Sequence, residues 1–343
     1  MHHRRTSQPG PLTRARAVAL SAVLATAAAT LSAAPATADP AAEHRAAAAR
    51  VDALYAQAER ATEKYNDAEE RTGKLRARAA TLQDRTARAQ ERVNRLRGKV
   101  GALAAADYRA GGIDPTLRLL LSERPGAYLE KAATLDRLHR SRAGELRTLL
   151  AARRVLDQHR SEAAHTLAEL AAGREAVARH KQEVQRKLAA ARRMLQALPA
   201  DARTAYQRPS RDDGRVGAAP GTGGAVAPSG RAAAAVRAAV GALGAPYVWG
   251  STGPSSFDCS GLTQWAYGRA GVSIPRTSQA QRGAGRRVPL SQARPGDLII
   301  YRSDASHVAL YVGGGQVVHA PHPGAQVRYE AVGMMPVSAV VRP

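Results

Sequence analysis

The sequence contains one cysteine, Cys259, and its surroundings favour a catalytic thiol. It lies in the stretch Asp258-Cys259-Ser260-Gly261, directly before a predicted helix over residues 260–269. At a helix N-terminus, unpaired N–H groups and the positive end of the helix dipole lower the pKa of a thiol and favour the thiolate. The alternative is a small buried core residue, but the polar neighbours suit an accessible helix start better. We therefore expect Cys259 to act as a nucleophile.

A thiol nucleophile needs a base within hydrogen-bond reach and a group that orients the base. Three histidines follow in the C-terminal region: His307, His319 and His322. His307 begins one predicted strand and His319 ends the next, and three consecutive glycines connect the two strands. We expect these two histidines to face each other across the ladder, where neighbouring Cβ atoms are ~4.5–5.5 Å apart. A cysteine with two histidines could also hold a metal ion at an open site.

The residues that could do this chemistry lie in a C-terminal module, residues 231–343, of normal domain size. It begins with two predicted helices, 231–243 and 260–269. Five strand-like runs follow, at 298–301, 308–312, 316–319, 327–330 and 337–341. Helices followed by strands indicate an α+β domain with an antiparallel sheet.

Five stretches in this module read, in order, PYVWGSTGPSSFDCSGLTQWAY, IPRTSQAQ, RPGDLIIY, SHVALYVG and VVHAP. They are similar, in order and spacing, to successive motifs of the NlpC/P60 family of cysteine peptidases. The resemblance covers residues 240–343 and implies a papain-like α+β fold and Cys–His–polar catalysis without a cofactor. It also implies hydrolysis of peptidoglycan stem peptides, usually at the D-γ-glutamyl–diaminopimelate bond.

The resemblance also implies a role for each matching position. Cys259 would be the nucleophile, His307 the base and His319 the third, orienting residue. Tyr247 would lie near the thiol and assist the oxyanion or the substrate, and the Cys259 backbone N–H would serve the oxyanion hole. The residues that would contact the acyl side of the stem peptide are Asp258, Ser260 and Ser278.

A long helical region, residues 39–198, precedes the module. Its first half places apolar or small residues at alternating intervals of three and four for fifteen steps, from Val51 to Leu103. This a/d pattern predicts a coiled coil. Two glycines and a proline near residues 111–115 end the first helix. The second helix keeps one column at intervals of seven, from Leu149 to Leu198. An antiparallel hairpin with its turn near 108–128 fits both halves, and parallel dimerisation through the first helix is the competing arrangement.

Residues 1–38 and 199–230 differ in composition from the helical region and the module. Residues 1–38 have the basic, apolar and Ala-x-Ala order of a secretory signal peptide, so we expect an exported protein that associates with the cell wall. Residues 199–230 are rich in Pro, Gly and Ala and predict a flexible linker.

The net charge is +23, from 51 basic and 28 acidic residues. In the helical region the basic residues are interspersed with acidic ones, which is typical of a solvated surface. No nucleic-acid-binding motif accompanies them.

These observations favour an exported endopeptidase that acts on peptidoglycan stem peptides. A thiol-dependent amidase or acyltransferase is the alternative within enzymes, and a wall-binding adaptor is the alternative outside them. The helical region is similar to the regulatory region of p60- and RipA-type wall hydrolases. That similarity implies that the coil can occlude the cleft or dock on a membrane-embedded division complex. The linker and the length of the coil independently motivate autoinhibition by the hairpin.

Overall fold

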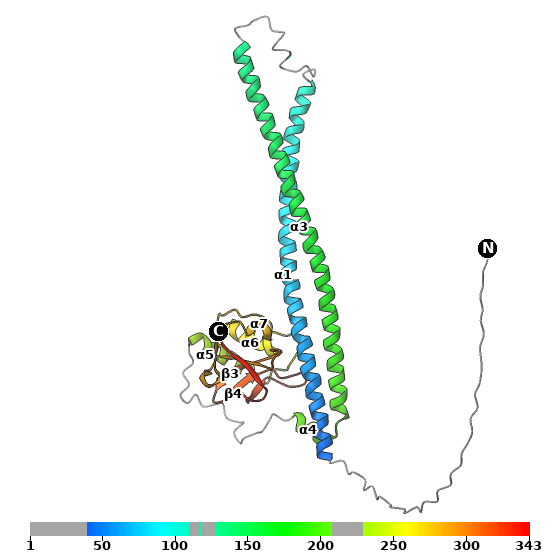
Figure 1. Ribbon diagram of the computed structural model, residues 1–343, viewed down its shortest axis with the longest axis vertical. Coiled ribbons are helices and arrows are strands. Elements are labelled where there is room, and N and C mark those ends of the chain that lie inside the picture. Colours follow the sequence, from blue (N-terminus) through cyan, green and yellow to red (C-terminus); the bar gives the residue numbers. More distant parts are fainter. Residues whose placement is uncertain (1–39, 110–116, 118–127, 208–228) are drawn as a thin grey trace, which may run out of the picture.

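We describe the fold from a computed structural model, which defines residues 40–109, 117, 128–207 and 229–343. The predicted signal peptide and most of the hairpin turn and linker lie outside these residues. The described chain comprises a helical hairpin and a C-terminal α+β module beside its lower half (Figure 1). None of the described helices is long and apolar enough to cross a membrane.

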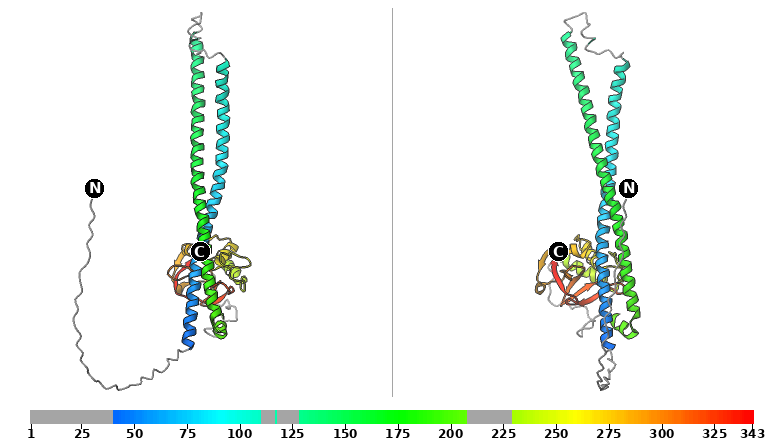
Figure 2. Two further views of the ribbon diagram at one scale, coloured as in Figure 1. Left: turned by 90° about the vertical axis from the view of Figure 1, so that its right-hand side faces the viewer. Right: turned by 45° about the vertical axis from the view of Figure 1, so that its right-hand side comes forward.

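The hairpin consists of two 70-residue helices, α1 (Pro40–Arg109) and α3 (Tyr128–Ala197). They run antiparallel, because Val51 near the start of α1 packs in one cluster with Val184 near the end of α3. The chain therefore folds back on itself, in the antiparallel hairpin that was one of the two arrangements the sequence allowed. Figures 1 and 2 show the two helices diverging toward the far end of the hairpin.

The heptad columns explain the packing of the two helices. All eight positions of the α3 column, from Leu149 to Leu198, are buried or half-buried. Small residues allow a close approach: a Cβ on Gly173 would lie only 2.9 Å from Oγ1 of Thr72. The packing between α1 and α3 ends toward the far end of the hairpin, where every residue of α1 from Gly101 to Arg109 is exposed.

Helical structure continues past the predicted boundary at residue 198. Residues Ala200–Gln207 form α4, so the flexible linker predicted for 199–230 is wrong over its first part. The physical reason is that Leu198 and Ala202 pack onto the lower end of the hairpin, which stabilises about two further turns of helix. Residue 230 belongs to the next helix, and 208–228 lie outside the described residues.

The module combines short helices with one antiparallel sheet, as the sequence predicted. Its helices are α5 (Gly230–Gly241), α6 (Cys259–Arg269), α7 (Ser278–Gln281) and the short 3-10 turn η2 (Leu290–Gln292). Its strands are β1 (Arg286–Val288), β2 (Leu298–Tyr301), β3 (His307–Gly313), β4 (Gln316–His319), β5 (Arg328–Ala331) and β6 (Val337–Arg342). The strand order is β1-β6-β2-β3-β4-β5.

The sheet and helices enclose the core that positions the site. Residues of α5 and α6 pack on one face of the sheet, where Leu262, Leu298 and Leu310 are fully buried. A second cluster around Ile299 and Tyr301 fills the other face. All four residues of the central strand β2 are buried, which explains its continuous apolar sequence. This packing fixes the ends of α6, β3 and β4, which carry the predicted site residues.

Candidate active site

Cys259 is the first residue of α6, and its thiol faces the carboxylate of Glu63 on α1. Asp258 caps the helix, since its Oδ1 accepts a hydrogen bond from the Gly261 N–H at 2.7 Å. The cysteine is only 2% exposed. Burial raises the thiol pKa well above its ordinary value, and the carboxylates of Glu63 and Asp258 raise it further. The lowered pKa that the helix start predicted is therefore wrong for this arrangement, because α1 buries the thiol and brings negative charge to it.

His307 and His319 meet at the ends of β3 and β4. His307 Nε2 lies 2.9 Å from His319 Nδ1, a hydrogen-bond distance, and the rings are nearly perpendicular at 88°. The strand register pairs Leu310 with Val318, which puts His319 opposite position 309. The two histidines are thus diagonal neighbours rather than directly opposite, and long side chains can span that separation. The predicted pairing is present, with a register that differs by two residues.

The next strand, β5, places the carboxylate of Glu330 beside this pair of imidazoles. Glu330 Oε2 lies 3.0 Å from His319 Nε2, and the other oxygen of Glu330 accepts a hydrogen bond from Arg328 Nε at 3.0 Å. Burial lowers the pKa of His319 to about 4. Burial alone would raise the pKa of Glu330, but its contacts with His319 and Arg328 outweigh that effect and lower it to about 2. The row is therefore a neutral imidazole beside a charged carboxylate.

The predicted substrate-contact residues lie on the other side of Cys259. Arg276, which the sequence did not single out, donates to both Asp258 oxygens and to Ser260 Oγ. Ser278 Oγ donates to a backbone carbonyl at 2.6 Å. Tyr247 is buried, and its pKa is raised well above its ordinary value first by burial and then by the nearby Cys259. Tyr247, Ser260 and Ser278 therefore lie close to Cys259 or share its partner Glu63, and the two histidines form a contact of their own.

Helix α1 packs over these site residues with its residues 55–66, which we call the covering segment. Figure 1 and the right-hand view of Figure 2 show α1 between α3 and the module. Glu63 carries the central contacts: one oxygen accepts hydrogen bonds from Ser260 Oγ at 2.7 Å and from Cys259 Sγ at 3.6 Å, and the other accepts from the Ser278 N–H at 3.0 Å. Burial and then the charge of Asp258 raise the pKa of Glu63.

One turn earlier, Glu59 contacts the histidine row. Its Oε1 lies 3.0 Å from His307 Nδ1, and its other oxygen pairs with Arg302. Burial would raise the pKa of Glu59, but His307 and Arg302 lower it to about 2. The two glutamates of this helix therefore differ in their preferred charge: Glu59 stays ionised beside the Arg302 guanidinium, whereas Glu63 is pushed toward its neutral form.

Polar and aromatic contacts flank the two glutamates. Asn66 Nδ2 donates to Asp258 Oδ2 at 3.1 Å. Tyr55 stacks on His322 at 4.5 Å between ring centroids, and Tyr65 meets Trp249 edge-on at 5.1 Å. In the sequence, Tyr55, Glu59, Thr62 and Asn66 follow intervals of four, three and four. This second row beside the heptad seam is the signal that could have identified a second packed face of α1.

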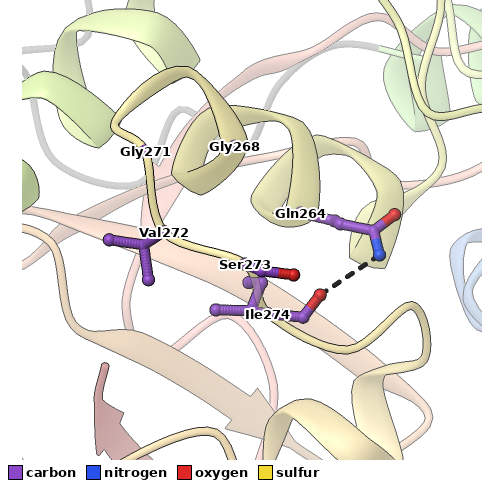
Figure 3. A pocket seen from close by; sticks show the side chains of 6 residues that line it. All are labelled: Gln264, Gly268, Gly271, Val272, Ser273 and Ile274. Atoms are coloured by element: carbon purple, nitrogen blue, oxygen red, sulfur yellow. Dashed lines mark hydrogen bonds between the residues drawn. The ribbon is translucent and has the colours of Figure 1, made fainter.

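Two hollows open near α6. The larger, about 510 Å³, lies where α1 meets the module and is lined by Tyr65, Asn66, Glu69, Glu70, Gly250, Gln264 and Arg276. The smaller, about 380 Å³, lies by the far end of α6, where Gln264 donates to the Ile274 carbonyl at 3.2 Å (Figure 3). Neither of these two hollows is lined by a predicted site residue. Over the part of the chain that is described, no three His, Cys, Asp or Glu residues form a group arranged to hold a metal ion.

Comparison with known proteins identifies the module. A model of the NlpC/P60 family matches residues 244–339. A probable endopeptidase of Corynebacterium glutamicum is 47% identical over 100 residues, 29% of this chain and 48% of that protein. The probable endopeptidase p60 of Listeria monocytogenes is 48% identical over 92 residues, 26% of this chain and 19% of that protein.

Two solved structures are also similar to part of this chain. The peptidoglycan hydrolase RipB of Mycobacterium tuberculosis is 38% identical, with a TM-score of 0.31 over 33% of this chain and 64% of that chain. The P60 domain of a Mycobacterium avium subspecies paratuberculosis antigen is 35% identical, with a TM-score of 0.31 over 33% of this chain and 93% of that chain. This chain spans half or less of the length of the curated relatives above. Its C-terminal module is a domain of the NlpC/P60 family.

Proposed function

We propose that this chain is an exported cell-wall peptidase that hydrolyses peptidoglycan stem peptides at the D-γ-glutamyl–diaminopimelate bond. The observation that carries the proposal is the His307–His319 contact beside the one cysteine of an NlpC/P60 module. The names of the relatives, probable endopeptidases and a peptidoglycan hydrolase, support the substrate class. The apolar N-terminal stretch of the sequence supports export and wall association.

The proposed reaction is acyl transfer through a thioester. His307 takes the thiol proton, and Cys259 Sγ attacks the carbonyl carbon of the scissile amide, so that its oxygen becomes an oxyanion beside the Cys259 N–H. His307 then gives the proton to the leaving amine. Water activated by His307 hydrolyses the acyl-enzyme and restores the thiol. Such acid–base work is worth roughly 10²–10⁴-fold in rate, and His319 holds the base in position.

The substrate contacts follow from the groups beside the thiol. Ser260 and Ser278 present a hydroxyl and a backbone N–H within reach of the thiol, both of them donors to a carboxylate. Asp258, which is ion-paired with Arg276, offers an acceptor for an amine. A stem peptide carries both kinds of group on the acyl side of the proposed bond. Tyr247 closes this side of the cleft near the thiol.

We further propose that the covering segment holds the enzyme inactive. In this arrangement Glu63 occupies the donors that a substrate carboxylate would use, and Glu59 contacts the nitrogen with which His307 would accept the thiol proton. The raised thiol pKa also disfavours the nucleophilic thiolate. Activity then requires α1 to leave the module. A partner that binds the open form better, such as a membrane division complex, would shift that equilibrium by its difference in affinity.

The experiment uses the full exported chain with Glu59→Ala and Glu63→Ala, which removes both covering carboxylates. Incubated with purified peptidoglycan fragments, this variant should release peptides that end in D-glutamate and new amino termini on diaminopimelate, detected by mass spectrometry. Adding Cys259→Ala should abolish release. Termini at the sugar–peptide linkage, or newly joined peptides, would instead show an amidase or acyltransferase. Binding without any cleavage would favour the adaptor.

A further inference from the structure

Three adjacent strands place His307, His319 and Glu330 in one row. The register of β4 and β5 pairs His319 with Arg328 and Val317 with Glu330, so Glu330 projects from the same face of the sheet as His319. The contacts along the row are 2.9 Å between the imidazoles and 3.0 Å between His319 Nε2 and Glu330 Oε2. Among the described residues, Glu330 is at ion-pair distance from that buried nitrogen, although the geometry does not meet the criteria of a hydrogen bond.

We propose that Glu330 is a positioning residue that decides which nitrogen of each histidine carries the proton, with Arg328 deciding which oxygen Glu330 presents. This inference rests on the proposed function, in which His307 is the base. It adds a carboxylate and an arginine to the Cys–His–His arrangement. Neither residue stands out in the sequence as a partner of the histidines.

The proton positions follow from what each group can donate. An ionised carboxylate only accepts, so Glu330, 3.0 Å from Nε2, favours the His319 tautomer that carries its proton on Nε2. Neutral His319 then has a lone pair on Nδ1, which accepts the Nε2–H of His307. Once α1 has left the module and taken Glu59 with it, neutral His307 keeps its lone pair on Nδ1. That nitrogen faces the covering segment, because Glu59 lies 3.0 Å from it. Glu330 therefore leaves free the nitrogen on the substrate side of His307.

Arg328 fixes which oxygen of Glu330 faces His319. Its Nε and Nη2 both donate to Oε1 of Glu330, which leaves Oε2 for His319. In a Glu330→Gln variant the single amide oxygen should stay with Arg328, because a guanidinium can only donate. The amide NH₂ then faces His319 and donates to Nε2. The proton of His319 moves to Nδ1, that of His307 moves to its own Nδ1, and the base nitrogen is blocked. An amide in place of an orienting carboxylate disables a catalytic histidine in this way.

The first measurement is independent of peptidase activity. Long-range ¹H–¹⁵N spectra of the full chain carrying Glu59→Ala and Glu63→Ala, recorded at pH 7, report which nitrogen of a neutral histidine is protonated, and a His319→Gln variant assigns the signals. We expect Nε2-protonated His319 in this chain and Nδ1-protonated His319 when Glu330→Gln is added. The low pKa of His319 keeps it neutral at this pH. An unchanged tautomer in the variant would overturn the proposal, even if the chain proved inactive on every peptide.

The second measurement uses cleavage by the Glu59→Ala, Glu63→Ala chain. Adding Glu330→Gln should lower kcat by roughly 10²-fold, with KM little changed, because the loss lies within the range of general-base catalysis. Adding Arg328→Leu as well frees the amide to turn its oxygen to His319, and should restore most of the rate and the Nε2 tautomer. Arg328→Leu alone should leave the tautomer unchanged. A purely structural role for Glu330 predicts the opposite: in this background, Glu330→Gln together with Arg328→Leu would be slower than Glu330→Gln alone.

Discussion

The two ends of the helical hairpin share one heptad pattern but have different surroundings. At the lower end, Val51 of α1 and Val184 of α3 are fully buried, and α1 packs against both α3 and the module. At the far end, Leu103 is 37% and Tyr108 85% exposed. The comparison teaches that a continuous seam specifies only one partner for each helix. The second face of α1 matters at the lower end alone, where the covering segment meets the candidate active site.

The largest effect should come from removing the contacts that exist only at the lower end. Glu59→Ala with Glu63→Ala deletes several buried hydrogen bonds and ion pairs, each worth about 1.5–3 kcal/mol when a charge takes part. We expect alkylation of Cys259 by iodoacetamide in the full chain to accelerate by roughly 10²-fold or more. Mass spectrometry of the intact chain measures this rate without any peptidoglycan.

The matched control for that prediction is another glutamate of α1. Glu91→Ala removes an exposed contact with Arg95, at 3.8 Å, far from the module. Exposed pairs of this kind contribute ~0–1 kcal/mol, so the alkylation rate should stay within twofold of the parent. Equal acceleration by both changes would mean that the covering segment is not what protects Cys259.

The next effect concerns the stability of the hairpin at its lower end. Leu188, 5% exposed, packs in the cluster of Val51 and Ala58. Leu188→Ala should lower the free energy of unfolding of the hairpin by about 2–4 kcal/mol, since a buried leucine leaves a cavity when truncated. Urea unfolding followed by the helical circular dichroism signal measures it. A loss below 1 kcal/mol would contradict the tight packing of this end.

Much of this fold could be predicted from residue patterns, because its elements are locally encoded. β2 and β4 coincide with the predicted runs, as both are short apolar stretches between turn residues. β1 was missed because Arg286-Arg287-Val288 has no strand pattern, and it is an edge strand that depends on pairing with β6. The predicted hairpin follows from heptad columns that are buried over most of their length.

The candidate site was predictable only in part, for the same reason. Cys259, His307 and His319 stand at the ends of locally encoded elements, so the sequence could bring them together. The direction of the thiol pKa could not be predicted, because it depends on Glu63, which lies 196 positions away. In the sequence Glu59 and Glu63 look like two more charges on a solvated helix. Glu59 and Glu63 differ from Glu91 only in the tertiary contacts that they make with the module.

A smaller effect should appear as a pH dependence of the covered state. Glu63 has its pKa raised, to about 8, while covered, and when α1 leaves it should return to an ordinary value near 4.5. The covered state therefore holds a proton that the open state releases. The stability from this proton is fully present below about pH 4.5 and is lost as the pH rises through about 8. Glu59 has a lowered pKa, so its contribution is constant above pH 5.

The measurement is the alkylation rate of Cys259 in the parent chain divided by that in the Glu59→Ala, Glu63→Ala chain. The ratio cancels the intrinsic ionisation of the thiol. It should rise about tenfold per pH unit from pH 6 and level off above pH 8. Glu63→Gln imitates the neutral acid beside Ser260 and the Ser278 N–H, so its ratio should stay flat. A flat ratio in the parent would show that Glu63 is already ionised there, held by Arg276 rather than opposed by Asp258.

The smallest effect should come from the far end of the hairpin. Leu146 and Leu150 of α3 are 49% and 48% exposed, and alanine is the better helix former at such positions. Leu146→Ala with Leu150→Ala should change the free energy of unfolding by less than about 0.5 kcal/mol and leave Cys259 alkylation unchanged. Urea unfolding and the same alkylation assay measure both quantities. If instead Cys259 became accessible, the hairpin would act as one rigid lever and the covering segment would respond to events at its far end. Unchanged protection means that the lower end holds the site closed by its own contacts, so a partner acting on the far end must supply the energy that breaks them.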